Sequence, residues 1–255
     1  MQKIALGIEY DGSRYCGWQK QKNGISVQDC VENALNIVTA ESVSVFCAGR
    51  TDSGVHALGQ VVHFETDVKY SKSAWTFGVN RYLPRSICIR WVSLMKQDFH
   101  ARFSAVSRRY YYYIYNDKIR SAILFQKTWH YTKLLDVCKM SRAAQYLLGE
   151  NDFSAFRSAG CQSYSRCRNL YHLRVIRIGQ CVIIDIQANS FLYRMVRNIV
   201  GSLVEVGCGN RPAIWILELL KSCKRSLAGM TAPADGLYLA EVKYPDHFFL
   251  SDERM

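Results

Sequence analysis

The chain has 255 residues, and its 33 lysines and arginines against 21 aspartates and glutamates give a formal net charge of +12. With 49% hydrophobic and 13% aromatic residues it can bury a sizeable core, which excludes a disordered polyelectrolyte. Such an excess of positive charge on a folded protein is typical of proteins that bind nucleic acid or an anionic membrane surface.

The sequence offers no support for a membrane or secreted protein. It contains no run of about 20 apolar residues, the length needed to span a bilayer. Glu9 and Asp11 lie where a secretory signal would need its apolar stretch. We therefore expect a soluble protein of the cytoplasm.

The first half of the chain predicts strands around one strong helix. Apolar and polar residues alternate over residues 4–10, as in a half-buried strand, and the dipeptide Asp11-Gly12 ends it. Ser26 precedes apolar residues at helical spacing, and Asp29 can complete a capping box, so a helix is predicted over residues 27–38. Residues 43–48 and 59–66 are predicted as strands, joined by a loop over residues 49–58.

The second half uses the same types of element. Strands are predicted at residues 108–116 and 236–244, and Gly179-Gln180 predicts a hairpin of residues 170–178 and 181–188. Three helices are predicted, one from Met140 to a stop at Gly149, one from Phe191 through Val206, and one from Pro212 through Leu220.

The interspersed strands and helices, with hairpins in both halves, predict a mixed α+β fold with a largely antiparallel sheet and helices against one face. We expect two halves, residues 1–105 with the 49–57 loop and residues 106–255 with a tyrosine-rich strand and an arginine-bearing helix. No Pro- or Ser-rich linker separates them, which predicts that they share one sheet or pack closely.

The ten cysteines do not indicate a zinc site. No C-x-x-C pair occurs, and the nearest pair, Cys161 and Cys167, has no histidine pair at ligand spacing. We expect reduced cysteines that act as small buried hydrophobic residues.

The loop over residues 49–57, G-R-T-D-S-G-V-H-A, is the first candidate for chemistry. It could be a polar connector, because Asp commonly caps turns. Arg50 lies two positions before Asp52 and can face the same side of an extended segment, where its charge would favour the ionised carboxylate. An ionised, positioned aspartate is a nucleophile or a base, so Asp52 is the catalytic candidate.

Two other interpretations of this loop are disfavoured. Ser53, His56 and Asp52 are too close in sequence to form the linear hydrogen-bonded relay of a catalytic triad. A metal site lacks the further carboxylates or histidines that would complete a coordination shell. His56 and His63 are therefore interpreted as structural.

Residues 99–115 interleave arginines with five tyrosines. Alternation along a strand directs Tyr110 and Tyr112 to one face, and Tyr111 and Tyr113 to the other. Most of these rings are expected to be core or cross-strand pairs, and the alternative for one of them is stacking on a flipped base.

Residues 189–201, N-S-F-L-Y-R-M-V-R-N-I-V-G, predict an apolar helix interrupted by two arginines. Arg194 is compatible with a solvent-facing position. Arg197 is expected near the buried side, where its charge needs a carboxylate partner. Asp52 is the candidate for that partner.

These three segments together resemble the tRNA pseudouridine synthase A family. The matching pieces are G-R-T-D-S-G-V-H-A, R-R-Y and F-L-Y-R-M-V-R-N-I-V-G, with Y-D-G-S-R-Y-C-G-W-Q at residues 10–19, D-F-H-A-R-F at 98–103 and L-L-G-E-N-D-F at 147–153. The resemblance implies conversion of uridines at tRNA positions 38 to 40, in the anticodon stem-loop, into pseudouridine. It implies the nucleophilic aspartate at Asp52, the active-site tyrosine at Tyr110, active-site arginines at Arg50 and Arg197, and neither cofactor nor metal.

The resemblance also implies two ferredoxin-like, RNA-recognition-like halves whose sheets join, with Asp52 in a cleft between them. It implies a homodimer in which one tRNA touches both subunits. The extra aromatics of the run Tyr110 to Tyr113 depart from the family pattern, although the R-R-Y frame selects Tyr110.

Two other classes of function are alternatives to this activity. A noncatalytic RNA-binding protein on the same scaffold would share the composition but has no reason to assemble Asp52 with Arg50 and Arg197. A metal-dependent nuclease would need several clustered carboxylates, whereas the candidate site has one aspartate.

Overall fold

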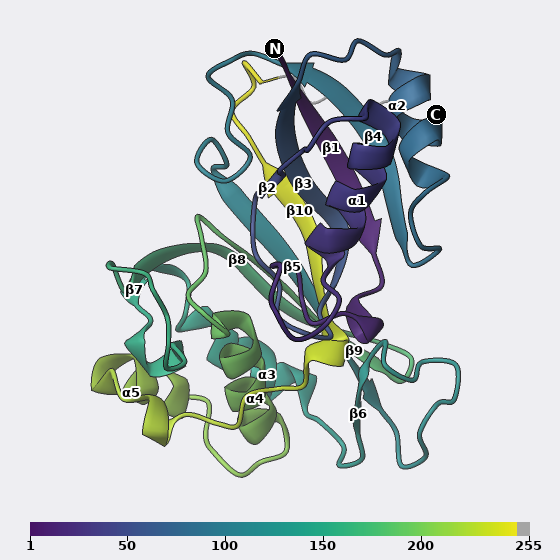
Figure 1. The fold of residues 1–255 in the computed structure, drawn as a ribbon. Helices are drawn as coiled ribbons and strands as arrows, with labels where there is room; N and C mark the ends of the chain where they lie inside the picture. The colour runs from purple at the N-terminus through teal and green to yellow at the C-terminus, as the bar shows by residue number, and fades with distance from the viewer. Residues whose placement is uncertain (249–255) are drawn as a thin grey trace. The chain divides into compact units, whose positions relative to one another are not determined.

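The computed structural model describes residues 1–248, which divide into two compact units (Figure 1). Among these residues, unit 1 comprises Met1–Val106 and Leu239–Phe248, and unit 2 comprises Ser107–Tyr238. Both units combine helices with mostly antiparallel strands, which confirms the predicted α+β class. No helix in residues 1–248 is long and apolar enough to cross a lipid bilayer.

Unit 1 is organised around its first strand. Strand β1 (Gln2–Tyr10) pairs antiparallel with β3 (His56–Thr66) on one side and β4 (Ile87–Met95) on the other. The two-residue strand β2 (Phe46–Cys47) pairs with β3, and β10 (Leu237–Lys243) is the next strand beyond β3. The helices are α1 (Val27–Thr39) and α2 (Lys72–Asn80), and a short 3₁₀ helix, η1 (Gly12–Arg14), follows β1.

Helix α1 begins at the predicted capping box. The Ser26 hydroxyl accepts from the Asp29 backbone N–H at 3.1 Å, and the Asp29 carboxylate accepts from the Ser26 N–H at 3.2 Å. These bonds satisfy backbone donors that the first turn cannot satisfy internally. Val31 and Leu35 on the same helix are fully buried, so its apolar face belongs to the core of unit 1.

Unit 2 contains mostly antiparallel strands and three helices. Its strands follow the order β5 (Ser107–Asn116), β9 (Cys181–Ala188), β8 (Cys167–Ile178) and β7 (Gly149–Asp152), and β6 (Trp129–Tyr131) pairs parallel with β5. The helices are α3 (Val137–Gln145), α4 (Met195–Gly207) and α5 (Trp215–Ser222), and α3 and α4 lie side by side (Figure 1). Three 3₁₀ helices complete the unit, η2 (Ser154–Phe156), η3 (Arg225–Leu227) and η4 (Ala234–Gly236).

Most predicted elements are confirmed, and the errors lie at their ends. The strand predicted at residues 43–48 is limited to β2, and β3 begins at His56, so the connecting loop ends at Val55 rather than Leu58. The helix predicted from Phe191 begins at Met195, because Arg194 adopts a left-handed φ of 57° that a helix cannot contain. The helix predicted from Met140 to a stop at Gly149 lies earlier in the chain, since α3 begins at Val137 and ends at Gln145. The helix predicted over residues 212–220 lies later, since α5 begins at Trp215 and ends at Ser222.

The cysteine prediction needs correction. All ten thiols are free, as expected, but none is in the fully buried class, and Cys138, Cys167 and Cys223 are exposed. The reason is their position on the elements, because α3 buries Met140 and Ala143 rather than Cys138. Cys223 ends α5 in a left-handed conformation. Within residues 1–248 no three His, Cys, Asp or Glu side chains are grouped to hold a metal ion.

His63 is a buried histidine within unit 1. It is 4% exposed, its ring stacks on Phe46 with centroids 5.1 Å apart, and its Nδ1 accepts from the Ala101 N–H at 3.1 Å. Burial, together with the nearby charges of His100 and Lys3, lowers the pKa of His63 from 6.5 to about 4.

The lowered pKa of His63 leads us to expect that the protein loses stability in mild acid. In the unfolded chain His63 becomes protonated below about pH 6.5, whereas in the folded protein it becomes protonated only below about pH 4. The free energy of unfolding therefore falls as the pH drops through this window, by about 2 kcal/mol between pH 7 and pH 5. Urea unfolding at both pH values should show this fall, and a His63→Phe variant should show a smaller one. Equal falls in both proteins would contradict the assignment to His63.

Candidate active site

Asp52 lies in the loop that joins β2 to β3, residues 48–55, called here the Asp52 loop. Thr51 is buried, Asp52 is half-buried and Ser53 is exposed. The Asp52 backbone carbonyl accepts from the Val55 N–H at 3.1 Å, and Gly54 between them has a φ of 81°. A left-handed residue at this point favours glycine, so the sequence D-S-G-V itself forms the tight turn that follows Asp52.

The residues on both sides of Asp52 are bonded to the segment that follows β1. The Tyr10 hydroxyl lies 2.7 Å from Thr51 Oγ1, and the Trp18 N–H donates to the Thr51 carbonyl at 3.0 Å. After the aspartate, the Ser53 hydroxyl donates to the Tyr15 carbonyl at 3.1 Å. These bonds come from residues far away in the sequence, and they fix the backbone of the Asp52 loop.

Two glycines allow this close approach. Gly17 has a φ of 87°, and a Cβ there would lie 2.6 Å from the Thr51 carbonyl oxygen. A Cβ on Gly12 would overlap the Val55 carbonyl group. Residues 10–19 were noted in the sequence only for their family resemblance, and their role in holding the loop was missed. The signal was present as two glycines within a short aromatic segment.

His56 and Ser53 support the earlier exclusion of a triad. His56 is 2% exposed, and its Nδ1 lies 3.1 Å from both the Gly12 N–H nitrogen and Asp11 Oδ1. The Ser53 hydroxyl points its proton at the Tyr15 carbonyl instead of at an imidazole. His56 therefore joins the start of β3 to the end of β1, which is a structural role.

Arg50 does not lie on the Asp52 carboxylate as the spacing suggested. It is exposed, and the ion pairs within residues 1–248 include none between Arg50 and Asp52. Its charge acts on Cys47, where burial raises the pKa of the thiol to about 11 and Arg50 opposes the rise. An exposed arginine within the Asp52 loop is in a position to meet an anionic substrate.

Tyr110 lies on β5 of unit 2 and is 8% exposed. Its ring packs edge-to-face on Phe191, with centroids 5.2 Å apart. Burial along β5 alternates, which confirms that Tyr110 and Tyr112 share one face. Tyr112 is fully buried and donates its hydroxyl proton to the Pro233 carbonyl at 2.8 Å, so it is a core residue.

On the other face of β5, the tyrosine rings pack against neighbouring side chains, one of which belongs to an ion pair. Arg109 makes a bidentate bridge to Asp185 at 2.7 and 2.5 Å, and its guanidinium lies over the Tyr111 ring at 5.3 Å. Tyr113 packs edge-to-face on Tyr238. These contacts give Tyr111 and Tyr113 structural partners and leave Tyr110 as the substrate candidate of the tyrosine run.

Arg197 lies in the first turn of α4 and is half-buried. Its Nε donates to the Ala232 carbonyl at 2.7 Å, and the Ala232 N–H donates back to the Arg197 carbonyl at 3.1 Å. This pair of bonds orients the guanidinium. Arg50 and Asp52 belong to unit 1, whereas Tyr110 and Arg197 belong to unit 2, so the meeting of the four residues stays a prediction.

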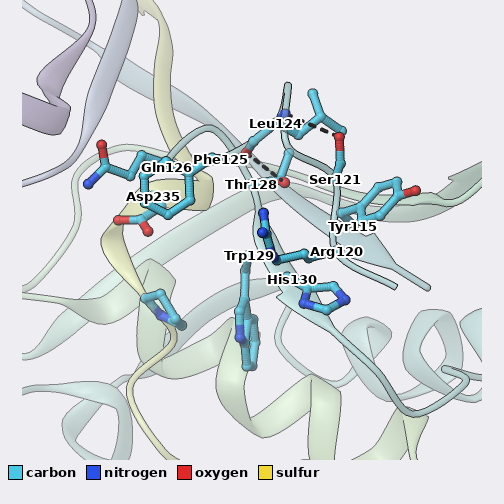
Figure 2. Close-up of a pocket in the computed structure, with 11 residues that line it drawn as sticks. Tyr115, Arg120, Ser121, Leu124, Phe125, Gln126, Thr128, Trp129, His130 and Asp235 are labelled. Atoms are coloured by element: carbon cyan, nitrogen blue, oxygen red, sulfur yellow. Dashed lines mark hydrogen bonds between the residues drawn. The ribbon is translucent and has the colours of Figure 1, made fainter. Parts of the chain in front are cut away.

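A hollow of about 270 Å³ in unit 2 was not anticipated from the sequence (Figure 2). Trp129, His130 and Arg120 line it together with Asp235 and with Leu124, Phe125, Gln126 and Thr128. None of the four predicted site residues contributes to its wall. The hollow is therefore distinct from the predicted active-site residues.

A family model described as tRNA pseudouridine synthase matches residues 7–104 and 143–245. The match spans most of the chain, and it includes the Asp52 loop, the residues 10–19 that hold it, and the first turn of α4. The chain belongs to the tRNA pseudouridine synthase family. It is therefore an isomerase.

Curated relatives agree with this assignment. The synthase is 72% identical over 248 residues to tRNA pseudouridine synthase A of Blochmanniella pennsylvanica, covering 97% of this chain and 95% of that protein. It is 67% identical to that of Blochmanniella floridana, with 97% and 98% covered, and 57% identical to that of Yersinia pseudotuberculosis, with 97% and 94% covered. A solved Cbf5-Nop10-Gar1 complex matches 79% of this chain and 45% of its own at 12% identity, with a TM-score of 0.33.

The family match places three of the four predicted residues of the synthase inside its ranges. Arg50 and Asp52 fall in the first range and Arg197 in the second, whereas Tyr110 falls between the two. The assignment of Tyr110 as the substrate tyrosine therefore rests on the R-R-Y frame and on its place beside Phe191.

Proposed function

We propose that this synthase converts uridines at positions 38 to 40 of the tRNA anticodon stem-loop into pseudouridine, with Asp52 as its catalytic residue. The family membership and the relatives named tRNA pseudouridine synthase A support the substrate class. The observation that carries the role of Asp52 is its loop, which residues 10–18 hold by hydrogen bonds before and after the aspartate. A catalytic group needs this fixed position because small displacements reduce rates strongly.

The chemistry requires only groups that these side chains provide. The bond between ribose C1′ and base N1 breaks, the base rotates, and a new bond forms from C1′ to C5. The C5 proton leaves and N1 gains a proton, so the reaction needs no oxidant or energy source. A carboxylate can attack the sugar or the base, or remove a ribose proton, while the pocket keeps the detached uracil at high effective concentration. We accordingly propose that the synthase uses neither a cofactor nor a metal ion.

The other three residues have supporting roles in this proposal. Arg197 is oriented by its two bonds to Ala232 and would keep Asp52 ionised. Tyr110 would stack on the uracil and assist removal of the C5 proton. Arg50, exposed on the Asp52 loop, would contact the RNA backbone.

The direct test is tritium release from an unmodified tRNA transcript that carries 5-tritiated uridine. Each isomerisation releases one tritium to water, because C5 loses its hydrogen when it forms the new bond to ribose C1′. The expected result is release by the purified protein with modified residues at positions 38 to 40. Tight tRNA binding without release would instead favour the noncatalytic RNA-binding alternative.

The Tyr110 hydroxyl has its own test. Tyr110→Phe keeps the ring that packs on Phe191 but removes the proton-transferring group, so we expect isomerisation to slow by about 10²-fold with little change in KM. Single-turnover rates on a tRNA transcript measure this. A near-normal rate would limit Tyr110 to a stacking role.

We also propose that the synthase acts in the cytoplasm as a homodimer that presents both subunits to one tRNA. Between β5 and β6 the chain exposes a set of apolar side chains, Ile119 at 77%, Ile123 at 91% and Phe125 at 67%. Exposed apolar clusters of this kind commonly mark protein contacts. Sedimentation equilibrium should give twice the chain mass, and an Ile123→Asp variant should sediment as a monomer.

A further inference from the structure

Unit 2 contains a second hollow, of about 340 Å³, whose wall is strongly basic. Three arginines line it with serine, glycine and cysteine residues, and we call it the arginine pocket. The arginines are Arg157, Arg166 and Arg225, and Ser154 and Ser158 also line it. None of the predicted active-site residues belongs to this wall.

The arginines of this pocket have no carboxylate among the residues that line it, and the nearby Asp152 carboxylate is bonded to the Ser154 N–H at 2.7 Å. The ion pairs found within residues 1–248 include none to its three arginines. Arg157 and Arg225 donate instead to neutral oxygens, for example Arg157 to the Cys161 carbonyl and Arg225 to Thr231 Oγ1 at 3.0 Å. Grouped cations without a counter-charge destabilise a fold unless an anion joins them.

Several buried polar atoms at the arginine pocket also have no hydrogen-bond partner. Ser154 Oγ and Arg157 Nε are inaccessible to solvent and unpartnered within the described residues, and so is Nε of the adjacent Arg168. Arg168 is 8% exposed. Burial lowers the pKa of Arg168, and the neighbouring charge of Arg157 lowers it further. Burial likewise lowers the pKa of Arg225.

The wall of the arginine pocket is held rigidly by Asn198, which is fully buried on α4. Its amide nitrogen donates to the Phe156 carbonyl at 2.8 Å and to Ser158 Oγ at 3.1 Å. Its amide oxygen accepts from Arg225 at 3.0 Å and from Thr231 at 2.7 Å. Two segments of the wall, distant in sequence, therefore meet on one side chain. A preorganised set of donors loses little entropy when it binds a ligand.

We propose that the arginine pocket binds a phosphodiester of the RNA backbone. Planar guanidinium groups and hydroxyls match the oxygens of a phosphate, and a phosphodiester supplies the missing negative charge. This inference rests on the proposed tRNA substrate and adds a contact in unit 2 that none of the four active-site residues provides. Free inorganic phosphate has the same chemistry, and the experiment separates the two sources.

The test measures tRNA binding and not turnover. Arg166 is exposed, so Arg166→Gln should fold normally, and Arg157→Gln provides a second variant on the inner wall. Arg142→Gln is the matched control, because Arg142 is exposed on α3 and does not line the pocket. Dissociation constants for an unmodified tRNA transcript are measured by filter binding from 50 to 200 mM salt, and thermal melting checks folding.

The expected result is about tenfold weaker tRNA binding for each pocket variant relative to the control. The slope of log affinity against log salt should fall by about 0.7 to 0.9, as for one lost phosphate contact. Slopes equal to the control in both variants would overturn the proposal. Inorganic phosphate that raises the melting temperature of the wild type but not of Arg166→Gln, with an unchanged tRNA slope, would assign the pocket to free phosphate and overturn the RNA assignment.

The two proposals can fail separately. Reduced slopes without any tritium release by the wild type would keep the arginine pocket and reject the isomerase reaction on this tRNA. Tritium release with unchanged slopes would keep the reaction and reject the pocket. A wild type that does not bind tRNA at all would reject both.

Discussion

Replacing Asp52 by Asn is expected to abolish tRNA isomerisation, with a rate loss of about 10⁴-fold or more. The amide has nearly the shape of the carboxylate, and the substitution leaves in place the bonds by which Tyr10, Trp18 and Ser53 hold the loop. Only the negative charge is lost, so nucleophilic attack and proton removal both fail. Single-turnover tritium release from 5-tritiated tRNA measures the effect.

Binding and folding provide the controls for this substitution. The Asp52→Asn protein should bind tRNA with an affinity within a few-fold of the wild type and should melt at nearly the same temperature. Asp117→Asn serves as a matched change, because this aspartate lies in the segment that follows β5 and accepts from the Ile119 N–H. Retained turnover in purified Asp52→Asn would remove this residue from the catalytic role.

The second large effect is expected at Gly12, which is not in the Asp52 loop at all. An alanine Cβ there would lie 1.9 Å from the Val55 carbonyl oxygen and 2.6 Å from its carbon. These two are backbone atoms, which cannot rotate away as the end of a side chain could. Either η1 or the end of the Asp52 loop must move. We expect a stability loss of about 2 kcal/mol from overpacking and a rate loss of about 10²-fold from misplacement of Asp52. Urea unfolding and single-turnover rates test the two parts.

Gly78→Ala is the matched control for this substitution. Gly78 lies within α2, and a Cβ there meets only Val38 Cγ1 at 4.0 Å, an ordinary van der Waals contact. Alanine has the higher helix propensity, so this variant should be as stable as the wild type or more stable, by about 0.5 to 1 kcal/mol. Equal rates and stabilities for Gly12→Ala and Gly78→Ala would contradict the proposed packing of η1 on the loop.

Local signals in the sequence were sufficient for much of the fold. The Ser26 and Asp29 capping box and the Gly179 turn are interactions between near neighbours, so their residues can be recognised without the rest of the chain. Helix α4 shows the limit of this approach. The apolar spacing continues back to Phe191, but the helix starts at Met195 because Arg194 turns the chain into a left-handed conformation. Spacing alone carries no information about backbone angles.

The candidate residues followed from motifs, whereas their supports did not. Asp52 stands out within a glycine-containing loop, but the bonds from its neighbour Thr51 to Tyr10 and Trp18 join positions more than 30 residues apart. The arginine pocket was missed for the same reason, since Arg157, Arg166 and Arg225 come together only through the folding of unit 2 around Asn198. No periodicity encodes such long-range contacts.

The division of the chain has a consequence for the order of folding during synthesis. Unit 1 is discontinuous, and Leu239–Lys243 of strand β10 follow the whole of unit 2. A Cβ on Gly59 of β3 would lie 2.5 Å from the Ala240 carbonyl oxygen, so β10 packs directly on the strand that follows the Asp52 loop. A ribosome must therefore translate unit 2 before unit 1 can be completed. A released chain that ends at residue 236 lacks β10, and protease should cleave it faster in unit 1 than in unit 2. The fold of unit 1 is therefore completed only by one of the last segments of the chain to be synthesised.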